Sequence, residues 1–254
     1  MQSTISIIII TKNAEKIINK CLNSLQFSNE IIVLDSGSSD RTKEICRQFT
    51  NLVFETDWQG FGIQKNRALE KATSDWVLSI DSDEEITEEL ALEIQTVIRE
   101  EKYTAFYMPR LSNYCGRWMK HGGWYPDYVL RLWKRGTAHF TNDLIHEKVV
   151  VENGEIGYLK QPLLHYAYDD LNSVLNKVNS YSTIGAEMAF EKGKKSSLSK
   201  AIVHGLSTFV KSYFLKLGFL DGREGFILAV SNAEGCYYRY LKLFYLNKTK
   251  EQVD

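Results

Sequence analysis

The sequence has 254 residues, enough for one large α/β domain or two smaller ones with a continuous core. Its 31 Lys and Arg nearly balance 32 Asp and Glu, and a formal net charge of −1 argues against a nucleic-acid binder. With 44% hydrophobic residues and three prolines, the composition is that of a folded protein rather than a disordered or collagen-like one.

Neither disulfides nor a membrane span is predicted. The four cysteines are widely spaced, with no CxxC pair and no His at zinc-finger distance. The apolar run at residues 7–10 is too short for a secretory signal and follows no positive charge. No uninterrupted apolar stretch reaches the roughly 18 residues of a membrane span. We therefore expect a cytoplasmic protein.

Strands and helices alternate along the first 100 residues. Continuous β-branched runs predict buried strands, and apolar residues at helical spacing predict helices. The predicted strands are residues 5–10, 30–35, 52–55 and 75–81, and the predicted helices are residues 13–25, 41–49, 63–72 and 84–101. The alternation predicts an α/β fold with a mostly parallel sheet. Residues 105–168 predict a mixed α+β section, and the chain after Leu171 is predicted to be helical.

Acidic residues follow two predicted strands, at the sheet edge where ligands of open parallel sheets bind. Asp81 and Asp83 end the fourth strand, and two carboxylates facing one pocket repel each other unless a cation lies between them. Hard oxygen ligands favour Mg²⁺ or Mn²⁺. The alternative is an acidic helix start that binds nothing.

Asp35 ends the second strand and precedes a Ser-Gly-Ser-Ser loop. Such small residues would let a nucleotide approach the backbone. The alternative is an ordinary turn in which Asp40 caps the next helix.

Four segments in this order and spacing resemble the family 2 glycosyltransferases of GT-A fold. They are SIIIITKN (6–13), IIVLDSGSSDRT (31–42), QKNRA (64–68) and WVLSIDSDEE (76–85). The resemblance implies a UDP-sugar donor and an Mg²⁺ or Mn²⁺ ion. The residues that it implies for the donor are Thr11, Asn13, Asp35 and Asp81, with Lys65 and Arg67 near the diphosphate, and those for the metal are Asp81 and Asp83.

Segments 122–127, 129–135 and 142–147 resemble the subgroup that transfers glucose to the inner-core heptose of bacterial lipopolysaccharide. The resemblance implies Glu147 as the base, with Asp143 as the second candidate, while His146 orients the substrate or packs. A sugar hydroxyl must lose its proton as it attacks the anomeric carbon, and one carboxylate suffices for this task. We therefore expect transfer with inversion.

The aromatic and basic residues of the middle section have two interpretations each. Trp124, Tyr125 and Trp133 would stack on an acceptor sugar, or would be core, and only Trp124 and Tyr125 are kept as acceptor candidates. Arg131 would meet an acceptor phosphate, and the alternative is a solvated surface charge, which we favour for Arg135. His165 would be a late metal ligand, but a lone His in an apolar strand is more often structural.

The resemblance and the composition together predict two parts. Residues 1–170 form the GT-A domain, with the nucleotide-sugar part at about 1–110 and the acceptor part at about 111–170, and residues 171–254 form a helical extension. Between Lys192 and Arg223 the chain has seven Lys or Arg and one acidic residue, and apolar residues at helical spacing (Ile202, Leu206, Phe209, Tyr213 and Leu217). A basic amphipathic helix of this kind binds an anionic membrane or packs on its own domain.

We therefore expect a metal-dependent hexosyltransferase, peripheral on the cytoplasmic face of the inner membrane, with a lipopolysaccharide core or other glycolipid acceptor. Two alternatives remain. A nucleotidyltransferase would share the sheet, the nucleotide and the paired carboxylates but would release pyrophosphate instead of UDP. A non-catalytic carbohydrate- or membrane-binding module would keep the fold without activity.

Overall fold

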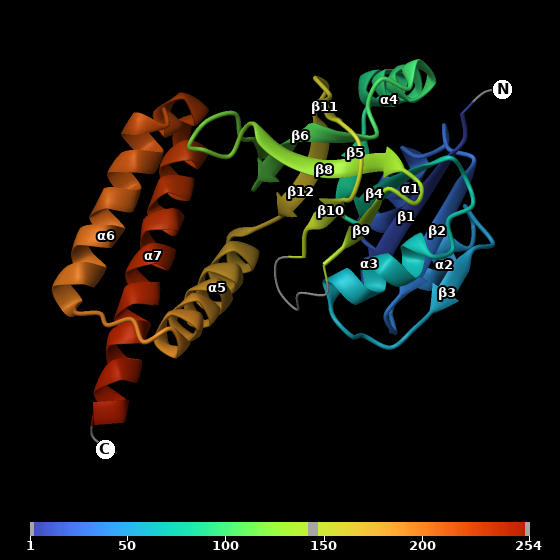
Figure 1. Ribbon diagram of the computed structural model, residues 1–254. Coiled ribbons are helices and arrows are strands. Elements are labelled where there is room, and N and C mark those ends of the chain that lie inside the picture. The colour runs from blue at the N-terminus through green and yellow to red at the C-terminus, as the bar shows by residue number, and fades with distance from the viewer. Residues whose placement is uncertain (1–2, 142–146, 252–254) are drawn as a thin grey trace. The chain divides into compact units, whose positions relative to one another are not determined.

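Figure 1 shows the computed structural model of the chain, which describes residues 3–141 and 147–251. The chain forms two compact units. The first comprises Met1–Arg110 and Asp127–His165, and the second comprises Leu111–Pro126 and Tyr166–Asp254.

Four parallel strands in the order β3-β2-β1-β4 begin the sheet of the first unit. The strands are β1 (Ile5–Thr11), β2 (Glu30–Asp35), β3 (Val53–Glu55) and β4 (Trp76–Asp81), and the helices between them are α1 (Ile18–Asn23), α2 (Thr42–Cys46) and α3 (Phe61–Leu69). The predicted alternation is confirmed, although α1 starts later than predicted. Asn13 has a φ of 50°, outside the helical region, so no helix begins there.

Antiparallel strands extend this sheet beyond β4. They are β5 (Glu84–Ile86), β6 (Ala105–Tyr114), β8 (Asp127–Lys134) and β12 (Leu163–Tyr168), with β11 (Ile156–Tyr158) parallel to β6 and a separate hairpin of β9 (Ala138–Phe140) and β10 (Val149–Val151). The α+β mixture predicted for residues 105–168 is wrong, because every helix or strand in the described part of this section is a strand, and most of them extend the sheet.

The helix predicted over residues 84–101 is wrong at its start. Residues 84–86 form β5, and helix α4 spans Glu88–Glu100. Thr87 Oγ1 accepts a hydrogen bond from the backbone N–H of Leu90 at 3.2 Å, so Thr87 is the helix N-cap. The acidic run therefore divides between a strand and a helix, and it places Glu84 in the sheet.

The central strand β1 is buried on both faces, as its unbroken run of isoleucines predicts. Ile7 and Ile9 pack in a core cluster with side chains of α1, α2 and α4, whereas Ile8 packs in a second cluster with Ala68 of α3 and Trp133. Each fully buried isoleucine stabilises the fold by about 1.5–3 kcal/mol. Helices thus cover both faces of the parallel strands. The packing of Ala68 in the core holds α3 beside the sheet (Figure 1).

The second unit is mainly helical. Its elements are β7 (Arg117–Trp118), α5 (Leu171–Glu191), α6 (Leu198–Val210), a π-helical turn at Lys211–Leu215, a 3₁₀ turn at Gly218–Asp221 and α7 (Gly222–Glu251). The single helical face predicted from Ile202 to Leu217 is therefore wrong, because α6 ends at Val210. Among the residues that the structure describes, no helix is long and apolar enough to cross a membrane.

The N-cap of α4 gives a test of this part of the fold. Thr87→Ala should lower the free energy of unfolding by about 1 kcal/mol, because the Leu90 N–H loses its acceptor. Thr87→Ser keeps the hydroxyl and should stay close to the wild type. Urea unfolding followed by circular dichroism measures both, and equal losses in the two variants would contradict the capping role.

Candidate active site

Three of the predicted residues meet at one edge of the sheet, where β1, β2 and β4 end. Thr11 is paired with Asp35 in the β1–β2 register, and Ile10 is paired with Asp81 in the β1–β4 register. The strands are parallel, so their carboxyl ends lie side by side, and this is the edge at which open sheets bind ligands.

Thr11 contributes an unsatisfied polar group to this edge. The residue is 5% exposed, and its hydroxyl has no hydrogen-bond partner among the described residues. An unpaired buried polar group costs about 1–3 kcal/mol. A polar ligand that reached Thr11 Oγ1 would remove this cost.

Asp35 is fully buried, and its carboxylate is held by the loop that follows it. It accepts hydrogen bonds from the backbone N–H groups of Gly37 (3.0 Å) and Ser38 (2.7 Å) and from the Ser38 hydroxyl. Asn13 joins the same loop, since its Oδ1 accepts from the Ser39 N–H at 2.9 Å and its own N–H donates to Ser38 Oγ at 2.8 Å. These contacts fit a strand-to-helix turn and also bring Asn13 beside the loop after Asp35.

A chain of alternating charges lies next to this edge. Lys65 Nζ is 2.9 Å from Asp81 Oδ1 and 3.0 Å from Glu147 Oε1, and its side chain is only 6% exposed. Arg131 Nη2 contacts Asp81 Oδ2 and lies 2.6 Å from Glu84 Oε1. The Asp81 N–H also donates to Glu84 Oε2 at 2.9 Å. Arg110 Nη1 lies 3.6 Å from Glu84 Oε1 as well, so three cations surround three carboxylates in a largely buried network.

The network shifts the pKa values of its members. Burial alone would raise the pKa of Asp81, but Arg131 and Lys65 outweigh it and hold this pKa well below the ordinary value. At Glu84, burial raises the pKa above its usual range despite the attraction of Arg131, and Asp81 adds to the increase. The two carboxylates outweigh the burial of Arg131 and raise its pKa further. Asp81 is therefore the firmly ionised partner of the two cations.

Asp83 is the more accessible of the two predicted metal ligands. Its side chain is 43% exposed, and its Oδ2 lies 3.6 Å from Nε2 of His165, on β12. Within residues 3–141 and 147–251, no group of three or more His, Cys, Asp or Glu side chains is arranged to hold a metal ion. The Asp83 carboxylate, at a partly exposed point, suits a hard divalent ion whose other ligands are waters and phosphate oxygens, as is usual for Mg²⁺, whereas the imidazole of His165 is not a ligand that Mg²⁺ favours. The donor set therefore fits a metal that the substrate helps to bind.

The side chains of Lys65 and Arg67 contact different parts of the first unit. They are two positions apart on α3, so their side chains point about 200° apart around the helix. Arg67 Nη1 contacts Asp57 Oδ1 and Gln64 Oε1, both at 2.9 Å, instead of the carboxylates of the network.

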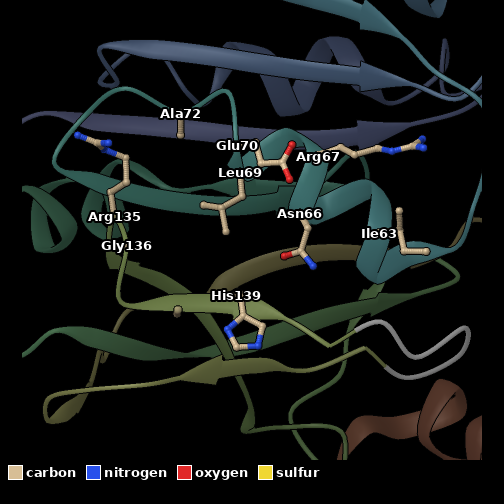
Figure 2. A pocket seen from close by; sticks show the side chains of 10 residues that line it. Ile63, Asn66, Arg67, Leu69, Glu70, Ala72, Arg135, Gly136 and His139 are labelled. Carbon is tan, nitrogen blue, oxygen red and sulfur yellow. The ribbon is translucent and has the colours of Figure 1, made fainter.

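Arg67 also lines a cavity of about 750 Å³ between α3 and β9. Figure 2 shows Asn66 pointing from α3 toward β9, in a different direction from Arg67. None of the residues that line this cavity belongs to the charged network.

The predicted acceptor residues lie in different surroundings. Arg131 is 6% exposed and belongs to the network, so it is not a solvated surface charge, whereas Arg135 is exposed. Trp133 is a fully buried core residue.

Trp124 belongs to the second unit, where its ring packs edge-on against Tyr114, with ring centroids 5.6 Å apart. The other predicted residue of that unit is Tyr125, half-buried before the cis bond to Pro126, and the predicted residues Asp143 and His146 lie outside the described residues.

The sequence predictions missed Glu84. Its side chain is fully buried and contacts Arg131, yet the acidic run from Asp81 predicts an exposed helix start. Thr87 was the signal that distinguishes a buried Glu84 from an exposed helix start. Threonine is a good N-cap, and a cap at position 87 moves the helix start beyond Glu84 and Glu85.

Comparison with known proteins supports the predicted family. The model of the family described as "Glycosyl transferase family 2" matches residues 6–156. The chain belongs to glycosyl transferase family 2. Its α/β fold is the GT-A architecture expected for this family, with a helical C-terminal part.

Full-length relatives of this family 2 glycosyltransferase are similar along nearly the whole chain. An uncharacterized glycosyltransferase of Rickettsia typhi is 31% identical, covering 98% of this chain and 89% of the relative. The lipopolysaccharide core biosynthesis glycosyltransferase LpsC of Rhizobium meliloti is 28% identical, covering 98% and 96%. Among solved structures, S. aureus TarS 1–349 in complex with UDP-GlcNAc aligns with a TM-score of 0.49 at 16% identity, covering 96% of this chain and 92% of that one.

The low pKa of Asp81 makes the stability of the glycosyltransferase pH-dependent. Unfolded Asp has a pKa of about 3.9, so the contribution of Asp81 to folding is fully present above that pH, begins to decrease near it, and is lost as the pH falls toward the lower pKa of the folded state. Asp81→Asn should be less stable than the wild type at pH 7, and the difference should shrink as the pH falls from 5 to 3.5.

Urea unfolding at pH 7, 5 and 3.5 measures this difference. Asp57→Asn is the control, because it breaks an exposed ion pair with Arg67 and should change stability little. A difference between Asp81→Asn and the wild type that stayed constant down to pH 3.5 would contradict the assignment.

Proposed function

We propose that this chain is an inverting, metal-dependent glycosyltransferase that moves a hexose, with glucose as the first donor to test, from a UDP-sugar to a heptose hydroxyl of a lipopolysaccharide core. The observation that carries the proposal is the position of Lys65, which contacts both Asp81 and Glu147 beside the carboxyl ends of the strands. The similarity to LpsC along 98% of the chain supports the acceptor class.

The donor would bind along the strand ends. The unpaired Thr11 hydroxyl, Asn13 and the loop after Asp35 would hold the nucleoside. Lys65 would face the diphosphate, because it is the α3 cation that lies beside Asp81, whereas Arg67 points elsewhere. Asp83, with His165 beside it and Asp81 nearby, would hold Mg²⁺ or Mn²⁺. The metal supplies Lewis-acid stabilisation of the charge that develops on the diphosphate.

Glu147 would act as the base. The acceptor hydroxyl oxygen attacks the anomeric carbon while its proton passes to the Glu147 carboxylate. The bond from the anomeric carbon to the diphosphate breaks on the opposite face, and its electron pair leaves with UDP. Lys65 stabilises the negative charge of the leaving group, so the departing diphosphate needs no general acid. One displacement of this kind inverts the anomeric configuration.

The base assignment predicts a sharp loss of activity. Glu147→Gln should lower kcat by about 10²–10⁴-fold, because the amide cannot take the proton. Calorimetry should show UDP and Mn²⁺ binding within about twofold of the wild type, since Lys65 keeps Asp81 as a partner.

Asp143→Asn is the matched change at the second candidate and should retain activity. Near-wild-type activity in Glu147→Gln together with a large loss in Asp143→Asn would assign the role of base to Asp143.

The product measured in these assays is UDP. Release of pyrophosphate would instead identify a nucleotidyltransferase. Absence of any turnover with a panel of nucleotide sugars would favour a non-catalytic module.

The second unit would attach the enzyme to the anionic cytoplasmic face of the inner membrane, where an amphiphilic acceptor is available. Large apolar side chains are exposed on α6 and on the turns before α7: Ile202, Val203, Leu206, Val210, Phe214, Leu215, Leu217, Phe219 and Leu220. The same segment contains Lys200, Lys211 and Lys216. Apolar side chains flanked by lysines are typical of surfaces that lie in the headgroup region of an anionic bilayer.

This attachment has a matched test. Leu206 and Leu92 are both 64% exposed, but Leu92 lies on α4 of the first unit. Leu206→Glu should weaken binding to phosphatidylglycerol vesicles about tenfold, because a buried leucine is worth about 1.5–3 kcal/mol. Leu92→Glu should have no effect.

Flotation with phosphatidylglycerol and with phosphatidylcholine vesicles measures binding, and light scattering measures self-association. Equal vesicle binding by the two variants and the wild type would overturn the membrane assignment. Loss of a dimer in Leu206→Glu alone would assign this face to a second copy of the chain.

A further inference from the structure

We infer that Gly62 and Asn66 are positioning residues that set the place of Glu147. The inference rests on the proposed function, in which Glu147 is the base. Both residues lie on α3, four positions apart, and therefore on the same face of the helix. That face lies against the backbone at residues 140 and 141, where the chain leaves β9.

Asn66 binds the backbone of Phe140 as a neighbouring strand would. Its Nδ2 donates to the Phe140 carbonyl oxygen at 2.8 Å, and its Oδ1 accepts from the Phe140 N–H at 2.9 Å. One side chain thus satisfies both polar groups of that residue. A side chain of this shape, with a donor and an acceptor two bonds apart, holds the end of β9 at a defined distance from α3.

Gly62 allows the chain to approach α3 closely. A Cβ at position 62 would overlap the carbonyl oxygen of Thr141 and would lie 3.0 Å from its carbonyl carbon and 3.4 Å from Cβ of Glu147. Gly62 lies within α3 and has no positive φ, so the glycine serves this contact rather than an unusual backbone conformation.

Phe140 and Thr141, which α3 holds in place, are bonded in turn to the two residues that follow Glu147. The Thr141 N–H donates to the Lys148 carbonyl oxygen at 2.9 Å, and the Lys148 N–H donates to Thr141 Oγ1 at 3.1 Å. Val149 is paired with Phe140 in the β9–β10 hairpin. Fixing residues 140 and 141 against α3 therefore fixes residues 148 and 149, and Glu147 precedes them.

The consequence is a defined distance between the base and the donor site. Lys65 lies on the same helix as the two clamping residues and pairs with Glu147 at 3.0 Å. A shift of about 1 Å in a catalytic group costs up to about 100-fold in rate. Gly62 and Asn66 therefore act on the reaction through Glu147, without touching either substrate.

Two substitutions test, by different routes, whether Gly62 and Asn66 position Glu147. Gly62→Ala adds one methyl group against Thr141 and should lower kcat at least about tenfold. Asn66→Asp keeps the size of the side chain but loses the donor to the Phe140 carbonyl, and it should lower kcat in the same way. In both variants the KM for the UDP-sugar and the affinity for UDP should stay within about twofold, because Thr11, Asp35 and Asp81 are untouched. Rates are expressed per UDP-binding site, which removes any loss of folded protein.

Gly235→Ala is the matched control. It is also a helical glycine without positive φ, but a Cβ there would meet only Val178 Cγ1 at an ordinary 3.7 Å. This variant should have the wild-type kcat.

The decisive comparison uses Glu147→Gln as the background. If Gly62 and Asn66 act through Glu147, adding either change to Glu147→Gln lowers the residual rate less than about twofold, because coupled residues are non-additive. The same tenfold loss in both backgrounds would show a general structural role and overturn the inference, as would an unchanged kcat in the single variants. Full activity in Glu147→Gln alone would instead remove the proposed base, so the two failures are distinct.

Discussion

The site depends on the burial of several charges at the end of β4. Asp81 and Glu84 are three residues apart and both face Arg131, so removal of the guanidinium would leave two carboxylates close together in a poorly solvated place. The pKa values show the balance: the cations dominate at Asp81, whereas burial dominates at Glu84. Lys65 extends the same network to Glu147, and charge neutralisation thereby ties together four elements of the first unit.

Helix α3 connects this network to the hydrophobic core. Ala68 packs in the same core cluster as Ile8 of β1, while Lys65, three residues earlier, reaches the carboxylates of Asp81 and Glu147. Gly62 and Asn66 face the segment that leads from β9. A helix that is fixed by its apolar side can therefore hold a cation close to that side and a backbone segment on another side, both at set distances.

The near-neutral net charge is the sum of two opposite regions. Residues 81–101 contain nine acidic residues and one basic residue, and residues 192–223 contain seven basic residues and one acidic residue. The acidic region includes the end of β4 in the first unit, and the basic region belongs to the helices of the second unit. Net charge alone therefore describes the whole chain but neither of its charged regions.

The sequence by itself determined the local elements and the family. The isoleucine run of β1 predicts a strand buried on both faces, and the position of Asp35 and Asp81 after such runs places both at one sheet edge. Only the tertiary structure decided which side chains meet there. Lys65 and Glu147 are 82 positions apart, and Arg131 and Glu84 are 47 positions apart, so no local pattern relates them. Arg131 is a buried partner of Asp81 because the antiparallel pairing of β8 with β4 brings it there, a long-range contact that composition and periodicity do not encode.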